Sequence, residues 1–224
     1  MLACRLQQSL WLPPLGGDHD LIVIGAQECE YKTKNGPGAI KHWPDHIMKQ
    51  LGEDWVLVDY ESMVEVRLFI AVRTEFRDSI TAIQNGKEAT GLGHLYGNKG
   101  GVGVAFNFFR TSMCFITAHL AAHQPEEKRR NDDVAEIFGG LSLGEFADKK
   151  IDPTCAFDHI FFCGDLNYRV DVTGDKHAPA NGSTLTDATV REHVARQDWA
   201  PLIAVDQLNR CKREGLVYEG FSEM

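Results

Sequence analysis

The sequence has no apolar run of membrane-spanning length, no closely spaced pair of cysteines and no continuous apolar leader. Its 224 residues are 43% hydrophobic and 25% charged, as in ordinary globular proteins. A membrane-spanning helix needs roughly 20 consecutive apolar residues, and two prolines interrupt the first apolar stretch at residues 1–17. The composition therefore excludes a membrane-spanning or disordered chain and predicts one large domain over residues 1–224.

The six cysteines include no CxxC pair, so neither a disulfide framework nor a zinc site is expected. Cys114 and Cys163 lie inside apolar runs, where a thiol usually behaves as a small hydrophobic group. A reducing, cytoplasmic compartment fits this usage best. The formal net charge of −9 argues against a nucleic-acid partner, because such proteins normally present a basic face. A small anionic substrate held by a few local cations stays compatible with that charge.

Short apolar runs of strand length dominate the chain. Seven strands are predicted, at residues 21–28, 55–60, 64–72, 79–86, 101–109, 113–120 and 159–166. Asn85-Gly86 is typical of a turn that would end the fourth run, and residues 110–112 are expected to form a hairpin connection. Short links between neighbouring runs favour an α+β fold, a two-sheet β-sandwich flanked by helices, over a doubly wound parallel sheet.

Two helices are predicted among these strands. The first covers residues 123–138, with Pro125 in its first turn and an exposed ion pair between Glu126 and Arg130. The second begins after Asp198 as N-cap and continues to residue 215. Its apolar stripe consists of Leu202, Val205 and Leu208.

Three of the predicted strands end in polar side chains. Glu28 ends the first, His119 ends the sixth, and Asp165 and Asn167 follow the last. Alternate residues of an extended chain face the same side, so Asp165 and Asn167 should point together, with Arg169 beside them. If these strand ends meet, they form a cluster suited to metal-assisted phosphoryl hydrolysis.

Each of these residues has a chemical and a structural interpretation. Glu28 could hold a Mg²⁺ ion that keeps most of its waters. Asp165 could take a proton from an attacking water, while Asn167 donates to the charge that develops on phosphorus and a protonated His119 binds a phosphate oxygen. Taken singly, an Asp or Asn after a strand is most often a turn former, and a lone histidine is most often a core residue. Only their joint appearance at three strand ends favours the catalytic interpretation.

The stretch at residues 91–104 is rich in glycine without matching a nucleotide-binding motif. Lys99 is followed by Gly100 rather than by Ser or Thr, which excludes a Walker loop, and the dinucleotide pattern also fails. The glycines could allow a tight turn into the next strand. Their backbone amides, together with Asn98 and Lys99, could equally line an anion site.

Taken together, four segments resemble the inositol polyphosphate 5-phosphatase family. They are VIGAQE (23–28), YGNKGGVGV (96–104), TAHLAAH (117–123) and FFCGDLNYRVD (161–171), and the similarity extends over residues 20–223. The resemblance implies the endonuclease/exonuclease/phosphatase sandwich. It also implies Mg²⁺-dependent removal of the 5-phosphate from phosphoinositides or soluble inositol phosphates by direct attack of water, with peripheral contact at the cytosolic membrane face.

The resemblance also implies a role for each candidate residue. Glu28 would be the metal ligand, Asp165 the base, Asn167 the phosphate-binding amide and His119 a contact of the scissile phosphate, with Asn98, Lys99 and Arg169 as substrate contacts. The family's earlier strand and its C-terminal motifs, which carry 4-phosphate contacts and a last catalytic histidine, have no counterpart, so the chain is expected to be incomplete at both ends. An inactive remnant that binds a partner or lipid, and a nuclease on the same fold, stay open as alternatives.

Overall fold

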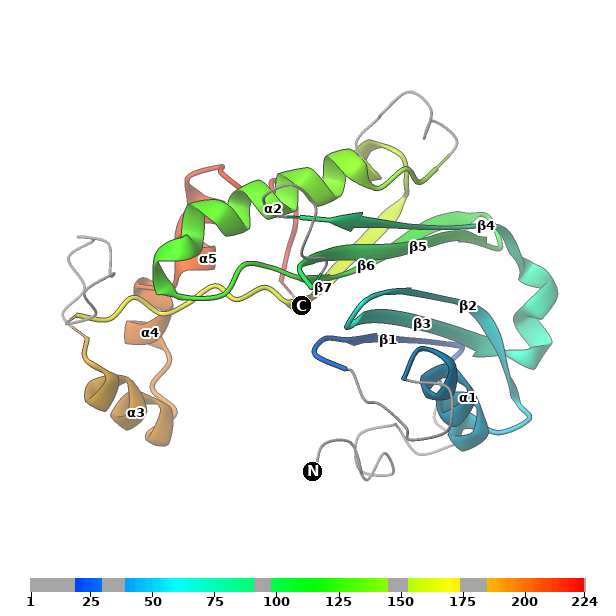
Figure 1. The fold of residues 1–224 in the computed structure, drawn as a ribbon, viewed down its shortest axis with the longest axis horizontal. Helices are drawn as coiled ribbons and strands as arrows, with labels where there is room; N and C mark the ends of the chain where they lie inside the picture. Colours follow the sequence, from blue (N-terminus) through cyan, green and yellow to red (C-terminus); the bar gives the residue numbers. More distant parts are fainter. Residues whose placement is uncertain (1–18, 30–38, 91–97, 145–152, 174–184, 224) are drawn as a thin grey trace.

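Two β-sheets pack face to face in the computed structural model, which describes residues 19–29, 39–90, 98–144, 153–173 and 185–223 (Figure 1). The strands are β1 (Leu21–Ala26), β2 (Trp55–Met63), β3 (Val66–Arg73), β4 (Ile80–Ala89), β5 (Gly100–Phe108), β6 (Thr111–His119) and β7 (His159–Asp165). The helices are α1 (Ala39–Leu51), α2 (Glu127–Gly140), α3 (Asp187–Ala195), α4 (Ala200–Ala204) and α5 (Gln207–Arg213). The predicted α+β fold of two sheets with flanking helices is confirmed.

The two sheets differ in how their strands pair. The first has the order β1-β3-β2 and is antiparallel throughout. The second has the order β4-β5-β6-β7, and β6 and β7 run parallel while the other pairs are antiparallel. A parallel pair needs a crossover connection, and α2 lies in the chain between these two strands.

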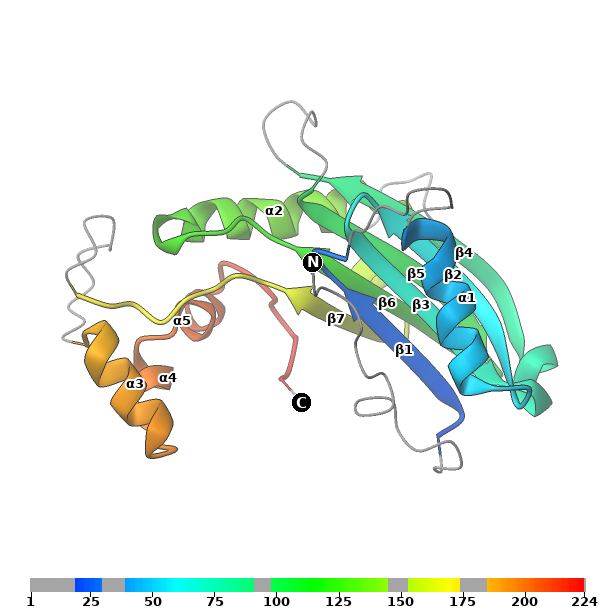
Figure 2. The ribbon, with the colours of Figure 1, turned by 60° about the horizontal axis from the view of Figure 1, so that its bottom comes forward.

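The central strand β3 explains the layer order, since apolar residues cover both of its faces. Leu68 and Ile70 pack into the core between the sheets, whereas Phe69 and Ala71 pack under α1. Alternate residues of a strand point to opposite faces, so a continuous apolar run buries both. Helix α2 covers the outer face of the second sheet, as Figures 1 and 2 show from two directions.

One local turn prediction was wrong, because strand pairing outweighed local preference. β4 continues through Asn85-Gly86, which pair with Val104 and Gly103 of β5. The Asn85 amide donates to Asp59 Oδ2 at 2.8 Å, so its polar side chain is bound without a turn. The predicted hairpin connection between β5 and β6 does form, although it is shorter than residues 110–112, since β6 already begins at Thr111.

The first predicted helix forms, but its expected surface ion pair does not. A short 3₁₀ turn at Gln124–Glu126 precedes α2, and Pro125 lies in that turn. Arg130 is fully buried and donates to the backbone carbonyls of Ala121 and His123. The predicted exposed pair of Glu126 with Arg130 is therefore wrong.

The second predicted helix is divided into α4 and α5. The side chain of Asp206 accepts from the backbone N–H of Asn209 at 2.8 Å and so begins a new helix at Gln207. Asp198 was predicted as an N-cap, but its carboxylate lies 3.0 Å from His193 Nδ1.

Two further helices were not predicted from the sequence. α1 contains Pro44, which normally argues against a helix interior. α3 begins at an N-cap made by Thr186 and Thr189, which exchange backbone and side-chain hydrogen bonds. In the part of the chain that the structure describes, no helix is both long and apolar enough to cross a bilayer.

Candidate active site

The parallel pairing of β6 and β7 places their C-terminal ends side by side, with His119 directly opposite Asp165. β1 reaches the same place because Gly25 lies against Thr117. A Cβ atom at Gly25 would come within 2.5 Å of Thr117 Oγ1, so only glycine permits this approach. Just beyond it, Gln27 Nε2 donates to the same Thr117 hydroxyl at 2.8 Å. These contacts bring Glu28 to the ends of β6 and β7.

Four side chains converge at this edge of the sandwich. His119 Nε2 lies 3.5 Å from Asp165 Oδ2, 3.9 Å from Glu28 Oε1 and 2.5 Å from Lys99 Nζ. His119 is only 2% exposed, whereas the side chains of Glu28 and Asp165 are 74% and 46% exposed. The imidazole thus forms the floor of the site, and the two carboxylates are open to a ligand.

Two of these strand ends contain strained backbone. Glu28 and Asn167 have φ values of 53° and 56°, the left-handed region that residues with a Cβ rarely adopt. Such a conformation costs about 1–2 kcal/mol for Glu28, and less for Asn167, because asparagine adopts it more readily than most residues. Strained residues of this kind concentrate at functional sites, where surrounding contacts hold them in place.

Asn167 is held from three sides. Its Nδ2 donates to the Leu120 carbonyl at 3.1 Å, and its backbone N–H donates to Asp165 Oδ1 at 3.2 Å. Arg169 donates to Asn167 Oδ1 at 2.5 Å through Nη2 and to the Asn167 carbonyl at 3.0 Å through Nε. Asp165 therefore makes the local turn contact that the structural interpretation expects, while its other oxygen faces His119.

The remaining predicted residue is Asn98, which is exposed and directly precedes Lys99 in the chain.

Burial and nearby charges shift the pKa values of Lys99 and His119. Burial lowers the pKa of Lys99, although Asp165 and Glu28 oppose that shift. Burial also lowers the pKa of His119, and the positive charge of Lys99 lowers it further. His119 is therefore neutral at pH 7, unlike the protonated ring expected from the sequence. Among the described residues, no hydrogen-bond partner reaches its buried Nδ1.

The donor set suits a hard cation that keeps most of its own water. Within the described ranges, no three His, Cys, Asp or Glu side chains converge closely enough to hold an ion. The site does offer the carboxylates of Glu28 and Asp165, both within 4.0 Å of one imidazole nitrogen. Carboxylate oxygens are the ligands of Mg²⁺ and Ca²⁺, and Mg²⁺ commonly binds through one or two carboxylates plus water. The residues present therefore fit such an ion.

Sequence reasoning missed two contributors to this site. Gln27 binds Thr117 and so fixes the strand end that carries Glu28. Glu65, in the hairpin between β2 and β3, raises the pKa of both Lys99 and His119 and so adds a third negative charge nearby. Nothing in the pattern around Glu65 distinguishes it from an ordinary turn residue.

The model of endonuclease/exonuclease/phosphatase family 2 matches residues 4–224 of this chain. The chain belongs to this family. Phosphatidylinositol 3,4,5-trisphosphate 5-phosphatase 2B of Danio rerio is 32% identical over 92% of the chain and 15% of its own length. Human synaptojanin-1 is 34% identical over 91% of the chain and 12% of its own length. The family predicted from the sequence, the inositol polyphosphate 5-phosphatases, is thereby confirmed.

Solved structures agree with this assignment. The inositol polyphosphate 5-phosphatase domain of a synaptojanin, solved with inositol 1,4-bisphosphate and a calcium ion, matches with a TM-score of 0.72 and 27% identity. That match covers 92% of this chain and 56% of the solved one. A Cimex nitrophorin, 16% identical with a TM-score of 0.60 over 93% of this chain and 65% of its own, shares the fold alone. The chain thus spans about half of the solved phosphatase domain and a small part of its curated relatives.

Proposed function

We propose that this protein is a phosphoric monoester hydrolase that removes the 5-phosphate of phosphoinositides or soluble inositol polyphosphates by direct attack of water. The observation that carries the proposal is the meeting of three strand ends: the carboxylates of Glu28 and Asp165 both lie within 4.0 Å of His119 Nε2. Family membership supports the same chemistry. We further propose that the two sheets and their helices serve as one catalytic domain.

The chain's own residues supply the groups that such a hydrolysis needs. Asp165 takes a proton from the attacking water, whose oxygen forms a bond to phosphorus while the bond from phosphorus to the inositol oxygen breaks. Asn167 donates from Nδ2 to the charge that develops on the phosphoryl oxygens. The inositol oxygen leaves with the bonding electron pair and takes a proton from solvent water, while Asp165 returns the proton that it accepted to the solvent. The products are therefore the alcohol and inorganic phosphate.

His119 and Lys99 orient the phosphate in this proposal. The neutral His119 ring forms the buried floor, and Lys99 contributes a cation beside it. Arg169 acts mainly by holding the Asn167 amide, and Asn98 lines the exposed margin. A Mg²⁺ ion held through Glu28 would offset the negative charge of the substrate phosphate.

The proposed substrates and location follow from the same site. One relative is named as a phosphatidylinositol 3,4,5-trisphosphate 5-phosphatase, and the solved synaptojanin domain holds inositol 1,4-bisphosphate. A phosphoinositide or its free headgroup is therefore the proposed partner, met in the cytoplasm or at the cytosolic face of a membrane.

The test is phosphate release from phosphatidylinositol 4,5-bisphosphate vesicles and from inositol 1,4,5-trisphosphate, each with Mg²⁺ and with a chelator. Asp165→Ala should reduce release at least a hundredfold, because the base is lost. Asp158→Ala is the matched control, since Asp158 is an exposed carboxylate beside the opposite end of the same strand.

The outcomes separate the alternatives. Release that survives Asp165→Ala in pure protein would overturn the mechanism. Vesicle binding without turnover, in folded protein, would indicate the binding module instead. Release that persists in the chelator would contradict the metal requirement. The Asp165→Ala result would still decide the role of Asp165.

A further inference from the structure

The side-chain amide of Gln207 is buried and fully hydrogen-bonded, although it lies outside the site. Its Oε1 accepts from Arg130 Nη2 at 2.5 Å and from the backbone N–H of Arg169 at 3.0 Å. Its Nε2 donates to Asp171 Oδ1 at 2.8 Å and to the Gln124 carbonyl at 3.2 Å. An amide offers two acceptor and two donor positions, and all four are used here.

Gln207 binds both backbone polar groups of Arg169, its N–H and its carbonyl. While its side chain accepts from the Arg169 N–H, its backbone N–H donates to the Arg169 carbonyl at 3.0 Å. Next to this pair, the backbone N–H of Asp171 donates to the Val205 carbonyl at 3.0 Å. The chain after β7 is thus fixed against the start of α5 along a short extended contact.

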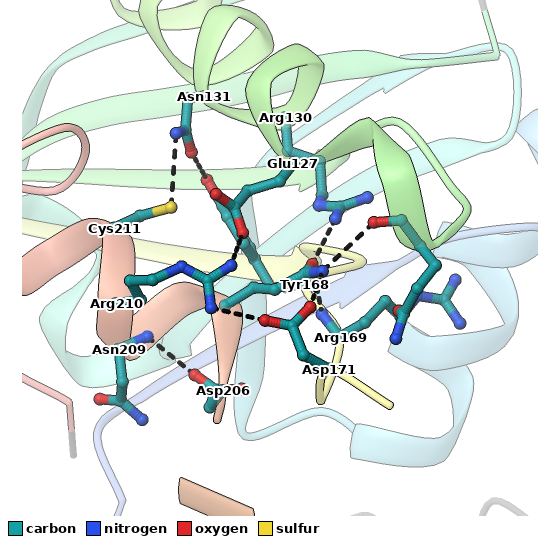
Figure 3. Close-up of polar contacts among 12 residues, drawn as sticks. Glu127, Arg130, Asn131, Tyr168, Arg169, Asp171, Asp206, Asn209, Arg210 and Cys211 are labelled. Atoms are coloured by element: carbon teal, nitrogen blue, oxygen red, sulfur yellow. Dashed lines mark hydrogen bonds and ion pairs between the residues drawn. The ribbon is translucent and has the colours of Figure 1, made fainter. Parts of the chain in front are cut away.

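An ionic chain anchors this contact to α2. Figure 3 shows Arg210 between Glu127 of α2 and Asp171, and its guanidinium pairs with both carboxylates. Asp171 is fully buried, and Arg210 Nη1 lies 2.5 Å from its Oδ2. A buried carboxylate with no partner is costly, so this pairing keeps Asp171 in place to receive Gln207.

Arg169 connects Gln207 to the reacting groups. Its guanidinium donates to Asn167 Oδ1 at 2.5 Å. This bond keeps the oxygen of the Asn167 amide toward Arg169. Asn167 Nδ2 then donates to the Leu120 carbonyl at 3.1 Å and keeps its second hydrogen for a phosphoryl oxygen. Without Arg169 in this place, only the Leu120 carbonyl would oppose a rotation of the amide that presents its oxygen to the phosphate.

We propose that Gln207 is a positioning residue of the hydrolase: it fixes Arg169, which in turn holds the Asn167 amide with its nitrogen toward the phosphate. This proposal rests on the proposed function. Gln207 touches neither substrate nor metal and acts through Arg169 alone. Its effect should therefore appear in the turnover step rather than in ground-state binding.

The first test is a double-mutant cycle on Gln207→Met and Arg169→Ala. Methionine keeps the length of glutamine but neither accepts nor donates strongly. Gln207→Met should lower kcat by about tenfold to a hundredfold, as a displaced catalytic group does, with KM changed by less than about twofold. In an Arg169→Ala background the same change should lower kcat less than about twofold, because the residue through which it acts is gone. Gln84→Met is the matched control, since Gln84 also accepts from a backbone N–H, that of Gly144 at 2.8 Å, far from the site.

A purely structural role predicts a different pattern. The kcat would then fall by the same factor in both backgrounds, or follow the folded fraction measured by thermal unfolding, and either result overturns the proposal. If Gln207→Met does not fold, Arg210→Met carries the same test from the network's rim, where Arg210 is 21% exposed. Its loss of kcat should also vanish in the Arg169→Ala background, and an additive loss would overturn the proposal.

Hydrogen exchange separates this proposal from the proposed function. The Arg169 N–H should exchange faster in Gln207→Met than in the wild-type protein, whereas the amides of β5 should be unchanged. Equal exchange at Arg169 overturns the positioning role even if the enzyme is active. Wild-type protein without Asp165-dependent phosphate release overturns the proposed function, and the exchange result still decides whether Gln207 holds Arg169.

Discussion

At the scale of single residues, Val64 holds a strained backbone conformation next to Glu65. It lies in the hairpin between β2 and β3 with φ of 51° and is 50% exposed. A β-branched side chain is especially unfavourable there, whereas glycine adopts this conformation freely. We expect Val64→Gly to raise the free energy of unfolding by about 1 kcal/mol, measured by urea titration.

The same substitution in a helix provides the control. Val194 is 47% exposed on α3, so it matches Val64 in exposure but not in backbone conformation. Val194→Gly should lower stability, because glycine costs about 0.5–1 kcal/mol in a helix. Two changes of the same sign would show that backbone strain at Val64 is not the cause.

A second residue-scale prediction concerns thiol chemistry. Burial raises the pKa of Cys114 to about 12, whereas Cys155 is exposed. The thiolate is the reactive form, and the raised pKa leaves Cys114 protonated throughout the range from pH 7 to pH 9. Iodoacetamide at pH 8 should therefore label Cys155 in the folded protein and Cys114 only after unfolding in urea, as followed by peptide mass spectrometry. Equal labelling rates would contradict the buried placement of β6.

At the scale of elements, the packing of α2 on the second sheet depends on the absence of a side chain at Gly101. A Cβ atom at Gly101 would lie 2.9 Å from Ile137 Cγ2 of α2. Overpacking of this kind costs about 1–3 kcal/mol, so Gly101→Ala should lower the unfolding midpoint. The loss should shrink in an Ile137→Ala background, where the obstructing side chain is absent.

Gly139 offers the opposite case on the same helix. Apart from the adjacent residues and the backbone of α2 itself, no atom lies within 4 Å of a Cβ built there, so Gly139→Ala should stabilise α2 by up to about 1 kcal/mol. If both glycine substitutions destabilise, a general intolerance of the helix and not the close approach at Gly101 would be responsible.

Elements were predictable where local preference and packing agree. The strand at residues 64–72 is apolar enough to be buried on both faces, and β3 is the central strand. Asn85-Gly86 failed as a turn because pairing with β5 supplied more hydrogen bonds than a turn could. The break at Asp206 could not be predicted, since its capping role depends on how Gln207 and its neighbours are held by distant residues.

The meeting of the strand ends was predicted for a reason that is only partly correct. Asp165 and Asn167 were expected on one face of an extended strand, but Asn167 is left-handed and lies beyond the end of β7. They come together through the turn bond from the Asn167 N–H to Asp165. The neutral state of His119 was not predictable either, because it follows from burial and from Lys99, which only the folded chain brings close.

At the scale of the whole molecule, the net charge of −9 bears on the nuclease alternative. Nonspecific DNA binding depends on neutralising phosphates with clustered cations. Excess duplex DNA at physiological salt should therefore leave phosphate release from inositol 1,4,5-trisphosphate unchanged. Inhibition that weakens steeply with added salt would favour a nucleic-acid substrate instead.

The crossover between β6 and β7 has a consequence for the order of events during folding. Asn167 reaches the Leu120 carbonyl from 47 positions further along the chain, with α2 in between. Contacts between distant positions form slowly, because closing the long loop costs conformational entropy before the contact contributes any favourable free energy. The hairpins can assemble well before β7 arrives, so we expect a refolding protein to regain its compact shape early and the proposed phosphate release only with the slowest phase. A newly made chain would then pass through a period in which it is already a sandwich and does not yet hold Asn167 in the candidate site.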